Sequence, residues 1–176
     1  MVRLSNRLMA VAGFIKEGAA VVDVGSDHGY LPVYLAQNGI ARRIIASDMS
    51  SGSLGAARRS AEKYGVADEI QFVVAPGLDG VRDSDVDTIV IAGVGGETIV
   101  SILEGAPWAK KGKSLILQPQ TKIEVLRKWL QDSGYSVRGE AQTQDRGRDY
   151  TVLQAEGSTM NSEFGIRNSE LLTTDH

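Results

Sequence analysis

The sequence predicts an α/β fold, in which one helix precedes a doubly wound, mainly parallel sheet of seven strands with helices on both faces. Short apolar runs alternate with helix-like segments five times along the chain, which is the pattern of a parallel sheet. Several of these runs end in aspartate or glycine, as strands do where they reach a binding edge. Two strand-like segments then close the chain, and they predict a terminal hairpin that places one antiparallel strand in the sheet.

The apolar spacing assigns the elements in order. Residues 4–16 repeat apolar side chains at helical spacing, and Gly18 ends this helix. The continuous apolar run at 19–25 predicts a strand that is covered on both faces. The other predicted strands are 43–48, 69–75, 87–92, 113–118, 135–141 and 150–155. The other predicted helices, most of them followed by a glycine, are 30–38, 51–64, 97–104 and 122–132.

Length and composition predict one domain in residues 1–157 and a polar tail in residues 158–176. The tail repeats Asn-Ser-Glu and has no useful apolar period, so we expect it to be disordered. The net charge of −3 provides no overall basic field, so binding of RNA would need a local patch or shape. The basic clusters that offer candidate phosphate contacts are Arg42 with Arg43, Arg58 with Arg59, Lys110 with Lys111 and Lys113, and Arg146 with Arg148.

Other residue counts exclude several classes of site. The chain has no cysteine, which excludes disulfides, thiolate zinc sites and a cysteine nucleophile. Its two histidines are too few for a histidine-rich metal site, so we expect no metal. No segment approaches the roughly 18 apolar residues of a membrane span. We therefore expect a cytoplasmic protein without membrane association, as a monomer or a weak homodimer.

The segment VVDVGSDHGYLP at 21–32 is the most informative motif. An apolar run ends in Asp23, and Gly25 and Gly29 let the backbone bend tightly and approach a ligand before a helix begins. The spacing is D-x-G-x-D-x-G, which is nearer to the D-x-G-x-G-x-G pattern of S-adenosylmethionine (SAM) methyltransferases than to G-x-G-x-x-G. Asp27 would repel a pyrophosphate but not the amino group of a methionine moiety, so the motif favours SAM over a nicotinamide dinucleotide.

Polar or glycine residues follow four of the predicted strands, and a parallel sheet brings these ends to one edge. Asp48 lies 23 residues after Gly25, close to the offset of about 20 residues at which an acid binds ribose hydroxyls. The alternative role for Asp48 is a helix N-cap, for which Ser50 competes. The residues expected to bind the cofactor are Asp23, Gly25, Ser26, Asp27, His28, Asp48, Met49, Gly77, Leu78 and Gly93.

Two further places in the sequence carry open alternatives. Asp27 and His28 precede a predicted helix, where an aspartate can cap the helix and a histidine can pack at its start. Alternatively, both contact the methionine part of SAM or the target base, and they are the candidate catalytic residues. The amide of Gln118, which precedes Pro119, either hydrogen-bonds an adenine edge or only shapes the loop.

Several motifs together resemble the bacterial tRNA (adenine-N1)-methyltransferases that act on adenine 22 of tRNA. They are LSNRL at 4–8, DVGSDHGYLP at 23–32, DTIVIAGVGGETIVSIL at 87–103, LILQPQ at 115–120 and LRKWL at 126–130. The resemblance covers residues from about 4 to 156 and implies a class I, Rossmann-like, SAM-dependent methyltransferase that acts on tRNA. The residues then expected to bind the substrate are Arg7, Tyr30, Gly95, Gly96, Gln118 and Pro119.

The sequence differs from the usual pattern of that family in three places. The family has Asn or Asp where this chain has Pro76, so Asp79 becomes the alternative contact for the adenine amino group of SAM. The methionine of the family's AGMGG loop is Val94. The family typically continues into a helical C-terminal domain that helps to hold tRNA, whereas this sequence continues into the polar tail.

The resemblance implies an in-line attack of adenine N1 on the sulfonium methyl group. N1 carries no proton, so the attack needs no strong base, and a carboxylate would stabilise the cationic product, with Asp27 as the candidate. Because N1 lies on the pairing edge, the base must be unpaired or flipped out. Two rival functions stay open: a methyltransferase for a small molecule or a protein, and a SAM-binding module without catalysis.

Overall fold

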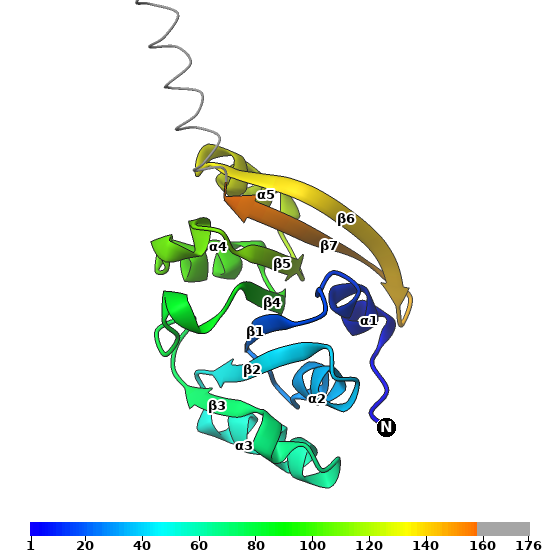
Figure 1. Cartoon of the computed structure of the whole chain (residues 1–176). Helices are drawn as coiled ribbons and strands as arrows, with labels where there is room; N and C mark the ends of the chain where they lie inside the picture. The colour runs from blue at the N-terminus through cyan, green and yellow to red at the C-terminus, as the bar shows by residue number, and fades with distance from the viewer. Residues whose placement is uncertain (158–176) are drawn as a thin grey trace, which may run out of the picture.

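The computed structural model describes residues 1–157, which form one seven-stranded sheet with helices on both faces (Figure 1). The strands are β1 (Ala19–Val24), β2 (Ala41–Asp48), β3 (Gln71–Val74), β4 (Thr88–Val94), β5 (Ser114–Pro119), β6 (Tyr135–Asp145) and β7 (Arg148–Gly157). The α-helices are α1 (Asn6–Ala12), α2 (Tyr30–Gln37), α3 (Ser51–Lys63), α4 (Gly96–Glu104) and α5 (Ile123–Asp132). Three short 3-10 turns are η1 (Ala67–Glu69), η2 (Asp83–Asp85) and η3 (Pro107–Lys110).

The strand order confirms the predicted fold class. The sheet runs β3-β2-β1-β4-β5-β7-β6, and the first five strands in this order pair in parallel. Only β7 breaks the pattern, since it pairs antiparallel with both β5 and β6. The order reverses between β1 and β4, and parallel sheets bind ligands outside the carboxyl ends of the strands at such a point.

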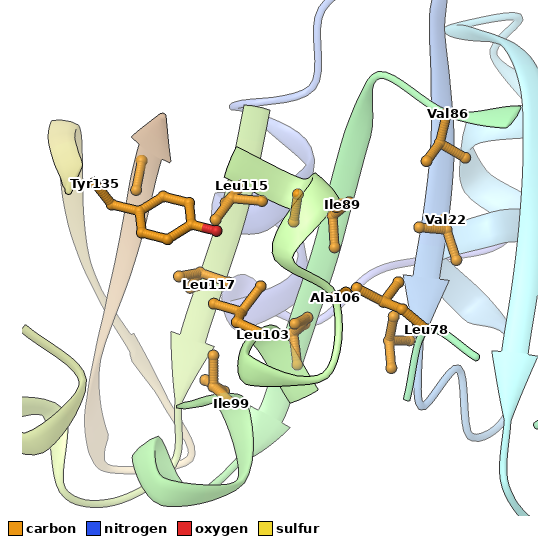
Figure 2. Packing of buried hydrophobic residues seen from close by; sticks show 14 of the residues in the cluster. Val22, Leu78, Val86, Ile89, Ile99, Leu103, Ala106, Leu115, Leu117 and Tyr135 are labelled. Atoms are coloured by element: carbon orange, nitrogen blue, oxygen red, sulfur yellow. The ribbon is translucent and has the colours of Figure 1, made fainter. Parts of the chain in front are cut away.

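Two apolar clusters hold the layers together. One face of the sheet packs against α4 and α5, and Figure 2 shows Ile99 and Leu103 of α4 beside Leu117 of β5. The other face packs against α1, α2 and α3, with Val21 and Val90 buried in the cluster on that side. Because successive residues of one strand point to opposite faces, a strand that is covered twice must be apolar throughout, and all six residues of β1 are buried. The one carboxylate in β1, Asp23, is therefore exceptional.

The first helix and the two closing strands differ most in length from the prediction. The first helix is shorter than 4–16: Ser5 caps it by accepting a hydrogen bond from the Leu8 N–H at 3.2 Å, and it ends at Ala12 with Gly13 as the C-cap. The closing strands are longer than predicted and leave only Arg146 and Gly147 in the turn. Both turn residues have left-handed backbone angles, with φ of 51° and 76°, as a tight hairpin turn requires.

The prediction of a disordered tail at 158–176 lies outside the described residues, and the domain boundary at residue 157 stays a prediction. Within residues 1–157, no helix has the length and apolar character that a membrane crossing needs.

Candidate active site

A cavity of about 1130 Å³ lies at the carboxyl ends of β1, β2 and β4. The N-terminal segment with α1 and the tip of the β6–β7 hairpin complete its wall. The predicted site residues that line it are Arg7, Asp23, Gly25, Ser26, Asp27, His28, Tyr30, Asp48, Met49, Gly77 and Gly93. The predicted site residues that do not line it are Leu78, Gly95, Gly96, Gln118 and Pro119. Most of the strand-end positions thus share one hollow, as the parallel topology requires.

The loop between β1 and α2 turns sharply at the centre of the cavity. Its N–H groups at Gly25 and Ser26 donate to the Ser47 carbonyl, at 2.8 and 3.2 Å, which ties the loop to β2. Gly25 has a φ of +74°, and no atom lies within 4 Å of the position that its Cβ would take. Asp27 adopts a φ of 51°, an uncommon angle for a residue with a side chain. The surrounding loop holds this strained residue at the cavity wall, which is typical of functional sites.

Gly29 serves packing. Its Cβ would lie 2.7 Å from Ala57 Cβ, so only glycine lets the start of α2 approach α3 this closely. Gly29 is also the N-cap of α2, and no side chain caps that helix. The alternative role of Asp27 as the cap of α2 is therefore wrong.

Two acids lie behind and beside this loop. Asp23 is buried, and desolvation raises its pKa to about 7, although the nearby Ser26 hydroxyl and the Arg7 charge each lower it. Asp48 is half-buried and accepts hydrogen bonds from the Ser50 N–H at 2.9 Å and the Asp27 N–H at 3.4 Å. Ser50, not Asp48, caps α3, because its hydroxyl accepts from the Ser53 N–H. Asp48 is thus left at the cavity wall beside the loop.

His28 and Tyr30 form an aromatic pair at the rim. Their rings stack with centroids 5.5 Å apart and an interplanar angle of 24°. Both side chains are exposed and line the cavity. His28 thus packs on the first residue of α2 and also faces the cavity, so both alternatives for this residue stay open.

Gln118 is fully buried at the end of β5 and holds Arg7 in place. Its Oε1 accepts from Arg7 Nη1 at 2.7 Å and from the Gly93 N–H at 3.0 Å. Its Nε2 donates to the Pro119 carbonyl at 3.0 Å and to Gln120 Oε1 at 3.4 Å. Both polar atoms of the amide are therefore engaged within the protein. Its hydrogen bond to Arg7 holds that side chain at the cavity wall. Gln120, rather than Gln118 or Pro119, reaches the cavity.

The glycine pair at the start of α4 (Gly95, its N-cap, and Gly96) and the leucine after β3 lie away from the cavity for packing reasons. The Gly96 N–H donates to the Thr121 carbonyl at 2.8 Å, and its Cβ would lie 2.2 Å from the Lys122 carbonyl oxygen. The Cβ of Gly95 would lie 3.0 Å from Thr121 Oγ1. Leu78 is buried in the cluster beneath α4.

The structure also brings residues into the cavity that the sequence interpretation did not place there. They are mainly Arg3 and Leu4 of the N-terminal segment, Thr98 and Ile102 of α4, and Asp145, Arg146 and Tyr150 of the hairpin. Asn6 of α1 donates to the Gln144 carbonyl at 3.0 Å and so joins the hairpin to α1 (Figure 1). The connection between the two closing strands, at residues 145–147, reaches the cavity because both strands are long and curved (Figure 1).

Comparison with known proteins identifies the family. Residues 4–153 match the family described as a methyltransferase domain. Over 163 residues, the chain is 37% identical to the tRNA (adenine(22)-N(1))-methyltransferase of Bacillus subtilis (strain 168), and the match spans 92% of this chain and 68% of the relative. The chain belongs to this methyltransferase family.

Solved structures agree with the assignment. The B. subtilis m1A22 tRNA methyltransferase TrmK superposes on the present methyltransferase with a TM-score of 0.83 and 36% identity, covering 89% of this chain and 68% of TrmK. Streptococcus pneumoniae Sp1610 in complex with S-adenosyl-L-methionine gives a TM-score of 0.84 and 38% identity, covering 89% and 74% of the two chains. Mycoplasma capricolum TrmK in complex with S-adenosyl-homocysteine gives 0.78 and 29%, covering 87% and 68%. The family that the sequence motifs predicted is confirmed.

Within residues 1–157 of the methyltransferase, no group of three His, Asp or Glu side chains is arranged to hold a metal ion.

Proposed function

We propose that this methyltransferase transfers the methyl group of SAM to N1 of adenine 22 in tRNA. One observation carries the proposal: a single cavity joins the acid-bearing loop of β1 to a wall that carries three arginines. The first side suits a cationic donor that has a ribose and an amino group. The second side suits a polyanionic acceptor. The family relationship supports the same pairing of donor and acceptor.

The residues of the β1 and β2 ends fit SAM. The space beside Gly25 lets a ligand approach the backbone, and Asp48, which lines the cavity, lies where an acid binds ribose hydroxyls. Asp27 and Asp48 give this side of the cavity a negative potential that favours an amino group and a sulfonium, and Asp23 adds to it when it is ionised. We assign cofactor contacts also to the predicted residues Met49, Gly77 and Gly93. When bound, SAM supplies an activated methyl group.

The acceptor base enters from the side of α1 and the hairpin. Adenine N1 attacks with a lone pair that carries no proton, so the protein mainly holds the base in line with the methyl group and excludes water. The exposed His28–Tyr30 stack offers an aromatic surface on which a flipped-out base can lie. The catalytic roles predicted for Asp27 and His28 stay predictions.

The arginines of the wall would contact the tRNA backbone. Arg3, Arg7 and Arg146 line the same cavity, although the chain as a whole has a net charge of −3. A local cationic surface of this kind supplies phosphate contacts that orient the RNA without reading its sequence. We infer that the enzyme acts in the cytoplasm, where tRNA is modified, and its predicted state as a monomer or weak homodimer stays a prediction.

Methylation of unmodified tRNA transcripts tests the proposal. The protein is incubated with SAM and tRNA, and mass spectrometry of the digested RNA measures N1-methyladenosine. We expect a methyl group on the natural transcript and none on a transcript with guanine in place of adenine 22. Binding of SAM without transfer to any tRNA would refute the proposal and favour a binding module or another acceptor class.

A further inference from the structure

The hairpin places one carboxylate in the cavity without a partner. Asp145, the last residue of β6, is half-buried and lines the cavity. Within residues 1–157, its carboxylate makes no hydrogen bond or ion pair. The neighbouring acids of the hairpin are engaged: Asp149 accepts from Gln144 Nε2 at 2.8 Å, and Glu140 pairs with Arg127. Asp145 is thus available to a ligand in a way that these two acids are not.

The position of Asp145 is well defined. It closes the ladder by pairing with Arg148 across a two-residue turn, and Tyr150 of the facing strand lines the same cavity. The hydrogen bond from Asn6 to the Gln144 carbonyl fixes the tip of the hairpin against α1 (Figure 1). A functional group on a strand that is tied at both sides is held more precisely than one on a free loop.

Asp145 also lies on a different wall from the other acids of the cavity. Asp27 and Asp48 sit at the ends of β1 and β2, where the Asp27 N–H faces Asp48 at 3.4 Å. Asp145 belongs to the hairpin, which joins the sheet beyond β5. A donor that is bound by the β1 and β2 ends therefore leaves the acceptor base between its methyl group and the wall that carries Asp145.

We propose that Asp145 is a catalytic residue that faces the acceptor adenine and stabilises the positive charge that the base acquires. The inference rests on the proposed function. In the transfer, the N1 lone pair forms the new N–C bond, and the electron pair of the breaking S–C bond stays on sulfur. Sulfur becomes neutral and the adenine becomes a cation, whose charge spreads to the exocyclic amino group. The amino N–H protons remain in place during this step, and a carboxylate that accepts from one of them favours the transition state.

Kinetics of matched variants test the assignment. Asp145→Asn removes the charge from the cavity, and Asp149→Asn removes a charge from the same hairpin outside the cavity. We expect Asp145→Asn to lower kcat/KM for tRNA about 100-fold, in line with the loss of one transition-state contact elsewhere. We expect Asp149→Asn to behave like the wild type and Asp145→Glu to restore part of the activity. The affinity for SAM, measured by calorimetry, should be the same in all four proteins.

Product binding separates a charge effect from a structural effect. The wild type should bind tRNA that carries N1-methyladenosine at position 22 more tightly, relative to unmodified tRNA, than Asp145→Asn does. Equal weakening for both RNAs, or equal kinetics of Asp145→Asn and Asp149→Asn, would overturn the inference. A loss confined to Asp27→Asn would overturn it too, because the charge would then be stabilised from the cofactor side. If the wild type methylates no tRNA, the proposed function itself fails.

Discussion

Substitution of Gly96 by alanine tests whether the glycine loop before α4 serves packing or substrate binding. The Cβ of Gly96→Ala would lie 2.2 Å from the Lys122 carbonyl oxygen and 3.0 Å from its carbonyl carbon. That oxygen cannot move freely, since it accepts the first hydrogen bonds of α5, from the N–H groups of Val125 at 3.2 Å and Leu126 at 3.4 Å. Relief of the clash must therefore separate α4 from α5 or distort the start of α5.

The size of the effect follows from two opposing contributions. Overpacking of a well-packed site costs about 1–3 kcal/mol. Alanine in place of a helical glycine returns roughly 0.5–1 kcal/mol. We expect Gly96→Ala to lower the free energy of unfolding by about 1 kcal/mol, which corresponds to a fall of roughly 2–4 °C in Tm for a chain of this size. The matched control is Gly52→Ala in the first turn of α3, where the nearest atom would be Ser50 Oγ at 3.6 Å. This control should gain stability by about 0.5–1 kcal/mol.

Urea denaturation of both variants measures the difference, with calorimetry of SAM binding to the folded proteins as the functional check. Gly96→Ala should keep the affinity for SAM, because Gly96 does not line the cavity. Equal stabilities of Gly96→Ala and Gly52→Ala would refute the packing argument. If Gly96→Ala kept its stability but had a raised KM for tRNA, the result would instead support the predicted role of Gly96 in substrate binding.

Three further predictions concern charges and hydrogen bonds at the cavity. Burial raises the pKa of Asp23 from 3.8 to about 7, so its stabilising contribution is complete below pH 3.8 and lost as the pH rises through 7. Relative to Asp23→Asn, the free energy of unfolding of the wild type without SAM should fall by about 4 kcal/mol across that window, as urea titrations at several pH values would reveal. Gln118→Leu leaves Arg7 and the Gly93 N–H without their shared acceptor, which should cost about 1–3 kcal/mol of stability and raise the KM for tRNA while the Kd for SAM holds. Arg146→Gln should reduce the slope of log K for tRNA against log salt concentration by about 1, whereas a filter-binding titration of Arg59→Gln should match the wild type.

The sheet and the cofactor side of the cavity could be predicted because their signals are local. A strand that is covered on both faces must be apolar throughout, and a parallel strand must deliver its last residues to the common edge. Asp48 follows from these rules as the last residue of its strand, and Asp23 is noticeable because it breaks the apolar run just before the strand ends. The sequence could also predict that a hairpin completes the sheet, since two segments of strand composition follow the fifth helix.

Of the acceptor side, the sequence analysis named Arg7, Tyr30 and Arg146, but it did not predict that they share one cavity with the hairpin, because these residues meet only in three dimensions. Strand periodicity predicts the hairpin but not its curvature. The register of its two strands shifts between Val137 and Gly139, and such an irregularity bends a strand. The Cβ of Gly139 would lie 3.0 Å from Phe14 Cε1, so the approach of the segment after α1 depends on a glycine far away in the sequence. The same ambiguity affects Gln118 and Gly96. A small residue or an amide at a strand end suits a ligand and close packing equally well, and only the direction of its contacts distinguishes the two.

Arg7 connects the two sides of the cavity electrostatically. Burial is the main reason that the pKa of Asp23 is high, and the Arg7 charge opposes that rise. The guanidinium that Gln118 holds toward the acceptor side therefore also favours the ionised acid behind the donor. A phosphate that pairs with Arg7 would weaken this support, whereas a cationic donor beside Asp23 would strengthen ionisation. We therefore expect the donor and the RNA to shift the ionisation of Asp23 in opposite directions, and so to weaken each other's binding through this acid.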